Sequence, residues 1–165
     1  MIRPADISDI PALAKIHVAA WQSAYSHILP DEILNNLSIP QFEANWQISF
    51  SDSRRENFVL EVDKKVKGFI SFGKGRDNDS THETGEIYGL YLVPDLWGTG
   101  YGRKLWEGIL KQLQSRFSIA TLWVLQKNRR ARGFYERIGF ECDNRVKEIS
   151  LYDIKLSETR YRKHL

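Results

Sequence analysis

Apolar residues recur at intervals of three and four near the start of the chain, which is the spacing of an amphipathic helix. We predict a helix that runs to about Ser26, with N-cap candidates before it and Pro11 in its first turn. Shorter helices are predicted to begin at 29–32 and 39–41. The apolar positions of the first helix are Ile10, Leu13, Ala14, Ile16, His17, Ala20, Trp21 and Tyr25.

Most of the later hydrophobic runs predict strands. Residues 57–62 and 66–72 flank a charged turn and indicate an antiparallel pair, and the polar residues 73–83 indicate a loop. Residues 119–125 are continuously apolar, as in a strand buried on both faces. Further strands are predicted over 2–4, 86–93, 140–142 and 147–156, with amphipathic helices after Gly102 and over 128–138.

This order of elements predicts the fold class. Helices, a β meander and then strand–helix–strand–helix–strand indicate an α/β fold, with a mixed sheet, helices on both faces and a right-handed crossover. The 165 residues contain no repeat and no linker, so a single domain over 1–165 is expected.

The turn after the strand at 86–93 is rich in glycine, with Gly98, Gly100 and Gly102 directly before a helix. Unpaired N–H groups and the positive end of the helix dipole favour a phosphate there, and glycine lets the ligand approach the backbone. The spacing is neither G-x-G-x-x-G nor a P-loop, which disfavours dinucleotide and NTPase folds. A plain connector remains the alternative.

Charge and composition exclude several other classes. Lys plus Arg minus Asp plus Glu is 24 − 21 = +3, without a dense basic tract, so nucleic acid is not an expected partner. Arg129, Arg130 and Arg132 suit an anionic cofactor or solvation. For the cluster at the end of the chain, Arg160, Arg162 and Lys163, solvation is expected.

Metal and membrane sites are not expected either. Cys142 is the only cysteine, which rules out an intrachain disulfide, and the four histidines lack metal-ligand spacing. Cys142 is expected to be a small apolar filler. The N-terminal residues lack a signal-peptide pattern and no run of 18 apolar residues occurs, so a soluble cytoplasmic protein without membrane contact is expected.

Two motifs resemble the GNAT superfamily of acetyl-CoA-dependent N-acetyltransferases. The first is Leu90-Tyr91-Leu92-Val93-Pro94-x-x-x-Gly98-x-Gly100-Tyr101-Gly102, and the second is Asn128-x-x-Ala131-x-x-Phe134-Tyr135-Glu136-x-x-Gly139-Phe140. Their order and separation are more specific than either motif alone. The chain departs from the family pattern where Trp97 replaces the usual Gln or Arg.

The resemblance implies a GNAT-like fold, in which a mostly antiparallel sheet is splayed at the acetyl-CoA site near Leu90, with Gly89 easing a bulge. No metal is implied. The implied cofactor contacts are Leu90, Tyr91, Leu92, Val93, Trp97, Gly98, Thr99, Gly100, Tyr101, Gly102, Arg103, Lys104, Asn128 and Ala131.

It also implies direct acetyl transfer to a primary amine, without a covalent enzyme intermediate. The amine must lose a proton before it attacks, and Glu86 is the candidate general base. Tyr135 is the candidate acid that protonates the leaving thiolate. The alternatives are an ion pair for Glu86 and a core position for Tyr135.

The acceptor is the least defined part of this hypothesis. Trp21, Tyr25, Trp46 and Tyr88 would form an aromatic wall for a cationic amine, or would belong to the core. The early helices and the segments 73–83 and 143–147 are expected to supply the rest of the site. A small or polyamine-like molecule is expected, and a protein or peptide acceptor is the alternative. A non-catalytic acetyl-CoA sensor and a nucleotide-binding regulatory module are further alternatives, and the last strands would allow a homodimer.

Overall fold

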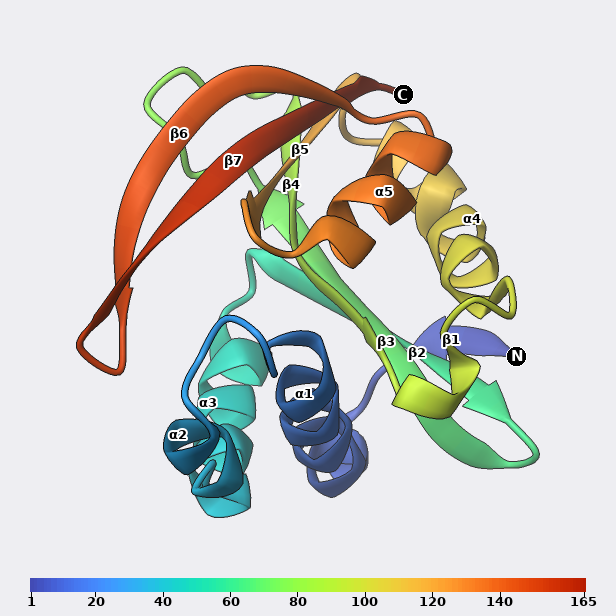
Figure 1. Ribbon diagram of the computed structural model, residues 1–165. Helices are drawn as coiled ribbons and strands as arrows, with labels where there is room; N and C mark the ends of the chain where they lie inside the picture. Colours follow the sequence, from blue (N-terminus) through green and yellow to red (C-terminus); the bar gives the residue numbers. More distant parts are fainter.

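A seven-stranded sheet forms the centre of the protein in the computed structural model, which describes residues 1–165 (Figure 1). The strand order is β1-β2-β3-β4-β5-β7-β6, and every neighbouring pair is antiparallel except β4 and β5. The prediction of a mixed, mostly antiparallel sheet is therefore confirmed. The strands are β1 (Ile2–Pro4), β2 (Arg55–Val62), β3 (Lys65–Lys74), β4 (Thr84–Leu92), β5 (Ile119–Leu125), β6 (Glu141–Leu151) and β7 (Ile154–His164).

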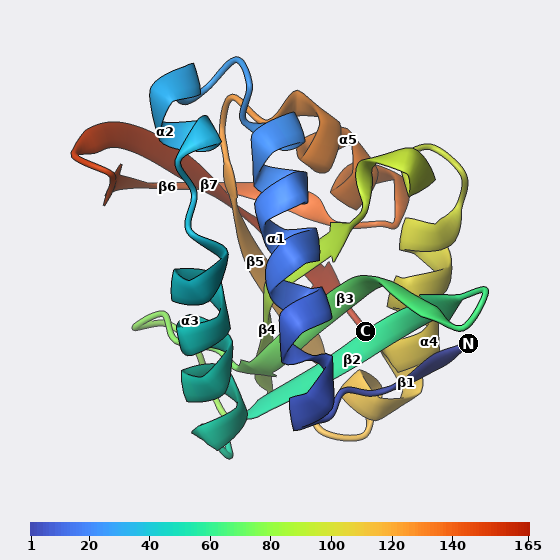
Figure 2. The same cartoon turned by 90° about the horizontal axis from the view of Figure 1, so that it is seen from below.

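Three helices cover one face of the sheet: α1 (Ile10–Ala24), α2 (Asp31–Asn35) and α3 (Ile39–Ser51) (Figure 2). A capping box between Asp6 and Asp9 begins a short 3-10 turn that leads into α1, and Pro11 lies in the first turn of that helix. The buried stripe of α1 packs with α3 and with the core-facing residues Val59 and Phe69 of the sheet. These helices place the C-terminal end of α1 beside the end of β5.

Two helices cover the opposite face: α4 (Tyr101–Gln114) and α5 (Arg129–Arg137). The apolar stripe of α4, which includes Leu105, Ile109 and Leu113, is fully buried against the sheet in the largest core cluster. Asn128 begins α5 by accepting a hydrogen bond from the Ala131 N–H at 3.1 Å.

The sheet splits between its two parallel strands. β4 and β5 pair only from Thr84–Ile119 to Ile87–Leu122, although β4 continues to Leu92 and β5 to Leu125. A bulge lies where the split begins, because Ser71 pairs with Gly89 whereas Phe72 pairs with Ile87. The edge of β4 beyond Ile87 consequently has no strand partner on the β5 side.

The C-terminal strands differ from the sequence prediction. Instead of strands over 140–142 and 147–156, the chain forms a long hairpin that turns at Tyr152 and Asp153, which have φ angles of 51° and 62°. The turn contains neither glycine nor proline, so no sequence signal marked it and the predicted second strand continued across these residues. Cys142 lies exposed on β6 instead of filling an apolar site.

Arg160, on β7, is also not solvated as the sequence predicted, because it is 3% exposed. It forms ion pairs with Asp77, Asp79 and Asp143 at 2.6 to 3.1 Å. This cluster fixes the loop between β3 and β4 to the C-terminal hairpin.

Candidate active site

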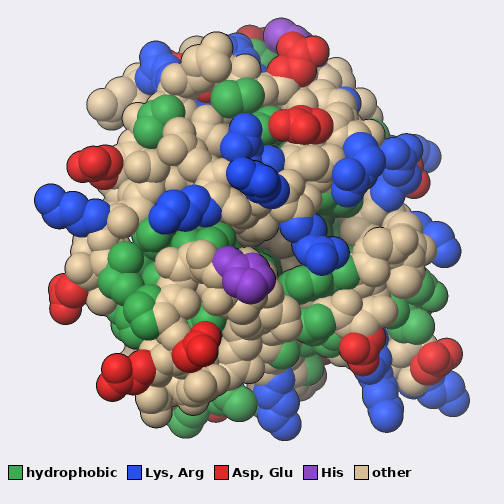
Figure 3. Space-filling model, viewed as in Figure 1, with side chains coloured by type: hydrophobic (Ala, Val, Ile, Leu, Met, Phe, Trp, Pro, Cys, Tyr) green, Lys and Arg blue, Asp and Glu red, His purple; other side chains and the backbone are tan.

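A cavity of about 540 Å³ occupies the split in the sheet. Its walls come from β4, β5, the glycine-rich turn, the helices α4 and α5, the C-terminal end of α1 and one residue of β7. Figure 3 shows the hollow on this face, with Lys and Arg side chains gathered along its rim and hydrophobic side chains beside it. Cavities at such a position are the usual sites for small ligands and cofactors.

The glycine-rich turn presents unpaired backbone donors to the cavity. The N–H groups of Gly98, Gly100, Tyr101, Gly102 and Arg103 have no acceptor in the protein. Gly98 and Gly100 have φ angles of 78° and 89°, and a Cβ at either position would meet nothing within 4 Å. The turn is therefore an open cradle of N–H groups at the N-terminus of α4, which suits an anion such as a pyrophosphate.

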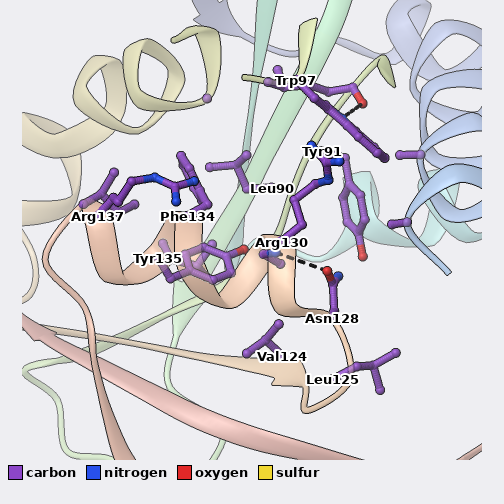
Figure 4. A pocket seen from close by; sticks show the side chains of 18 of the residues that line it. Leu90, Tyr91, Trp97, Val124, Leu125, Asn128, Arg130, Phe134, Tyr135 and Arg137 are labelled. Atoms are coloured by element: carbon purple, nitrogen blue, oxygen red, sulfur yellow. Dashed lines mark hydrogen bonds between the residues drawn. The ribbon is translucent and has the colours of Figure 1, made fainter. Parts of the chain in front are cut away.

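Three arginines surround this cradle and add positive charge. Arg103 from α4 and Arg130 and Arg137 from α5 all line the cavity. Figure 4 shows Arg130 extending from α5 toward the Trp97 ring, with Arg137 on the same helix. Because guanidinium groups bind phosphate oxygens through paired donors, this end of the cavity is matched to a ligand with several phosphate charges.

Trp97, at the position where the family has Gln or Arg, is fixed at the end of β4. Its Nε1–H donates a hydrogen bond to the carbonyl oxygen of Leu92 at 3.1 Å, and its ring lies under the Arg130 guanidinium. The substitution therefore leaves the backbone donors of the turn intact and holds the Arg130 guanidinium near the cradle.

Tyr135 lies on α5 with its side chain in the cavity (Figure 4). It is 9% exposed, and burial raises the pKa of its hydroxyl above that of a free tyrosine. The group therefore keeps its proton at neutral pH and can act as a donor.

Glu86 does not line the cavity. Its side chain is 2% exposed, and its carboxylate accepts hydrogen bonds from the Arg76 backbone N–H at 2.9 Å and from the Arg76 guanidinium. The structure joins Glu86 to Arg76 and not to the cavity that Tyr135 lines.

The predicted aromatic wall divides into two groups. Tyr25 and Tyr88 line the cavity. Trp46 is instead part of the core, 5% exposed, with its ring centroid 4.7 Å from that of Phe69, because the apolar face of α3 packs on the sheet. Trp21 stands behind the wall, where its Nε1–H donates to the Tyr91 hydroxyl at 3.3 Å.

Most of the predicted cofactor contacts meet at the cavity. Val93, Thr99, Tyr101 and Lys104 do not line it with the rest, since Val93 packs toward α1 and Lys104 lies over the Tyr101 ring. The residues that line the cavity as predicted are Leu90, Tyr91, Leu92, Trp97, Gly98, Gly100, Gly102, Arg103, Asn128 and Ala131.

Four residues with functional chemistry line the cavity without having been singled out for this site from the sequence: Trp123, Arg130, Arg137 and Glu158. Arg130 belongs to a basic cluster that the sequence does contain. Trp123 and Glu158 reach the cavity only through the pairing of β5 with β7, which no local pattern reveals.

The chain offers no group of three or more His, Cys, Asp or Glu side chains placed to hold a metal ion. None of its helices combines the length and the apolar composition needed to cross a membrane.

Related proteins agree with this architecture. The family model for the acetyltransferase (GNAT) family matches residues 10–140. An uncharacterized N-acetyltransferase of Bacillus subtilis is 36% identical over 129 residues, which cover 77% of this chain and 72% of that protein. A probable N-acetyltransferase of Mycobacterium tuberculosis is 29% identical over 148 residues, 88% of this chain and 82% of that protein.

Solved structures show the same fold. The PaiA N-acetyltransferase of Thermoplasma acidophilum, in complex with coenzyme A, superposes with a TM-score of 0.81 at 19% identity, covering 100% of this chain and 98% of that one. The ribosomal-protein-alanine N-acetyltransferase of Brucella melitensis gives a TM-score of 0.76 at 20% identity, with 100% and 99% covered. With its split sheet and its cradle of N–H groups, the chain belongs to the GNAT family of acetyl-CoA-dependent N-acetyltransferases.

Proposed function

We propose that the protein transfers the acetyl group of acetyl-CoA directly to the primary amine of a small molecule, through a ternary complex. The observation that carries this proposal is the cradle of five unpaired N–H groups beside three arginines and a cavity of about 540 Å³. The cradle fits the pyrophosphate of the cofactor, and the unpartnered edge of β4 from Tyr88 to Leu92 offers donors and acceptors to the amide groups of its arm.

Bound acetyl-CoA would supply a thioester carbonyl that the amine nitrogen attacks, after which the C–S bond breaks and the thiolate leaves. Tyr135 is proposed to protonate that thiolate sulfur. Support comes from its position in the cavity and from its raised pKa, which keeps the proton available at neutral pH. Asn128 is proposed to hold the start of α5 in place and to direct its free amide N–H₂ toward the cofactor.

The acceptor amine must also lose a proton. Glu86 remains the predicted base, and it would act through water because its carboxylate does not line the cavity. The three N–H groups of Arg76 that bind the carboxylate occupy most of its acceptor capacity. The prediction for Glu86→Gln is a loss of kcat with little change in the KM for acetyl-CoA.

The proposal can be tested by thiol release from acetyl-CoA with a panel of amines, comparing the wild type with Tyr135→Phe. Loss of the hydroxyl is expected to lower kcat about 100-fold while the KM for acetyl-CoA stays unchanged. Tyr152→Phe, at the exposed tip of the C-terminal hairpin, is the matched control. Thiol release from no amine, together with no stabilisation by coenzyme A in thermal melts, would overturn the proposal.

The acceptor is proposed to be a small or polyamine-like amine, because the aromatic side chains of Tyr25, Tyr88 and Trp123 line the cavity. A protein N-terminus is the second candidate, since one structural neighbour is a ribosomal-protein-alanine N-acetyltransferase. A peptide with an N-terminal alanine, added to the amine panel, distinguishes a small-amine acceptor from a protein N-terminus.

A further inference from the structure

Glu158 is the only carboxylate among the residues that line the cavity. It lies on β7 opposite Leu125 of β5, and its side chain is 19% exposed. The carboxylate accepts no hydrogen bond from the protein. Its one charged partner is the Lys147 ammonium, whose Nζ lies 3.5 Å from Glu158 Oε2. A largely buried carboxylate with only this ion pair keeps most of its hydrogen-bonding capacity free.

The Lys147 side chain places an ammonium group beside Glu158 and Trp123 in the wall of the cavity. Its Nζ lies 4.1 Å from the centroid of the Trp123 ring as well as close to Glu158, so one ammonium sits between a carboxylate and an indole. Both partners line the cavity. A carboxylate beside an aromatic face is a favourable setting for an ammonium ion. The Lys147 side chain is 40% exposed and can leave this position for solvent.

The other carboxylates on this side of the sheet are already bound. Glu86 is held by Arg76, and Asp79 forms two hydrogen bonds with Arg160 at 2.7 and 2.9 Å. Asp77 accepts from the Trp123 Nε1–H at 3.0 Å and from Arg160, which also binds Asp143. Glu158 alone is therefore available to a ligand.

The Asp77 contact also fixes the indole that Lys147 covers. Asp77 accepts a hydrogen bond from Trp123 Nε1–H, which lies at the edge of the indole. This bond limits rotation of the indole, so the face of the ring stays turned toward the Lys147 ammonium. Arg103, Arg130 and Arg137 also line the cavity, and Figure 4 shows Arg130 and Arg137 apart from Leu125, the residue that pairs with Glu158. The cavity thus has a cationic end for phosphates and a separate anionic wall.

We propose that Glu158 binds an ammonium group of the acceptor in place of Lys147, and that the enzyme thereby selects amines with a second positive charge. This inference rests on the proposed acetyl transfer. The attacking nitrogen must be neutral, so it offers no charge to Glu158 at the moment of reaction. An acceptor with two amino groups can place one at the thioester and the other between Glu158 and Trp123.

The test compares 1,4-diaminobutane with n-butylamine in the thiol-release assay. For Glu158→Gln, the KM for the diamine is expected to rise about tenfold to a hundredfold while kcat changes less than about threefold, because a charge-assisted contact is lost. The KM values for n-butylamine and acetyl-CoA are expected to stay unchanged. Glu148→Gln, an exposed carboxylate on β6, is the matched control.

Lys147→Met provides an independent variant that keeps apolar packing on Trp123. Removal of the competing ammonium is expected to lower the KM for the diamine several-fold. An equal fall of kcat for both amines in Glu158→Gln would make Glu158 the base and overturn the ammonium-binding role. Unchanged diamine kinetics in both variants, or turnover of peptides only, would also overturn it.

A failure of the proposed function itself gives a different result. Thermal melts with coenzyme A alone, and with coenzyme A plus the diamine, separate the two. If coenzyme A raises the melting temperature, but the diamine neither raises it further nor is acetylated, only the Glu158 inference is contradicted. No shift with coenzyme A sinks both proposals.

Discussion

The guanidinium of Arg130 lies over the indole ring of Trp97, with Cζ 4.9 Å from the ring centroid. The two residues come from α5 and from the turn before α4, so the contact joins the two helices across the mouth of the cavity (Figure 4). It gives a physical reason for the departure from the family pattern at position 97. The ring holds an arginine beside the cradle of N–H groups, where the family has a polar side chain.

Trp97→Ala is expected to lower the free energy of unfolding by about 1 to 2 kcal/mol, because it removes a cation–π contact and a hydrogen bond to Leu92. It is also expected to weaken coenzyme A binding, since Arg130 loses its support. Denaturant melts and a coenzyme A titration measure the two effects. Trp97→Phe keeps a ring under Arg130, so it should lose only part of the stability and part of the coenzyme A affinity. Identical losses in the two variants would argue against the cation–π contact.

Gly100→Ala is expected to weaken acetyl-CoA binding at least tenfold. The backbone φ of 89° is costly for alanine by about 1 to 2 kcal/mol, and the new methyl group would enter the open cradle. Gly133→Ala is the control, because it lies within α5 at an ordinary φ and its Cβ would meet only the flexible end of Arg137. Undiminished affinity in Gly100→Ala would remove the cradle from the binding site.

Arg160→Met is expected to lower the free energy of unfolding by about 3 kcal/mol, since it leaves three carboxylates together without their common cation. The same guanidinium holds the pKa of Asp79 at about 2. Arg162→Met removes an exposed arginine two residues further along β7 and should change stability by less than about 0.5 kcal/mol. Equal melting curves for the two variants would contradict the structural role of Arg160.

His17 predicts how stability depends on pH. Five aromatic rings surround it, and burial lowers its pKa to about 3. The unfolded chain binds a proton near pH 6.5, so this contribution to stability is complete above pH 6.5 and is lost as the pH falls toward 3. The loss should reach about 3 kcal/mol near pH 4.5, because each pH unit below 6.5 costs about 1.36 kcal/mol.

Denaturant melts between pH 7 and 4.5 measure this loss. In His17→Leu, which cannot titrate, the decline should be shallower by the same amount. Parallel curves for wild type and variant would show that other groups cause the acid sensitivity.

Local patterns in the sequence predicted the helices, the central strands and the glycine-rich turn that lines the cavity. The strand, the alternate glycines and the helix that follow one another over 84–114 form one continuous segment, so the geometry of the cradle depends on nearby residues only. The helical spacing of Leu105, Ile109 and Leu113 likewise determines which face of α4 is buried.

The part of the cavity near Glu158 depends on contacts between distant residues. Glu158 and Trp123 meet at the cavity because β7 pairs with β5, and Arg160 is buried because loop 75–83 folds over it. A charged strand such as 141–151, exposed along much of its length, has no clear alternation to mark its register. The placement of Trp46 in the acceptor site was wrong for a local reason. Helical spacing does not distinguish an aromatic residue in the core from one that lines a cavity.

The most direct test of the central claim is a calorimetric titration of the protein with acetyl-CoA, repeated in the presence of ATP. The account predicts one binding site per chain that ATP does not block and that Gly100→Ala weakens at least tenfold. Binding that is absent, or that ATP abolishes while Gly100→Ala leaves it intact, would contradict an acetyl-CoA site in the split between β4 and β5.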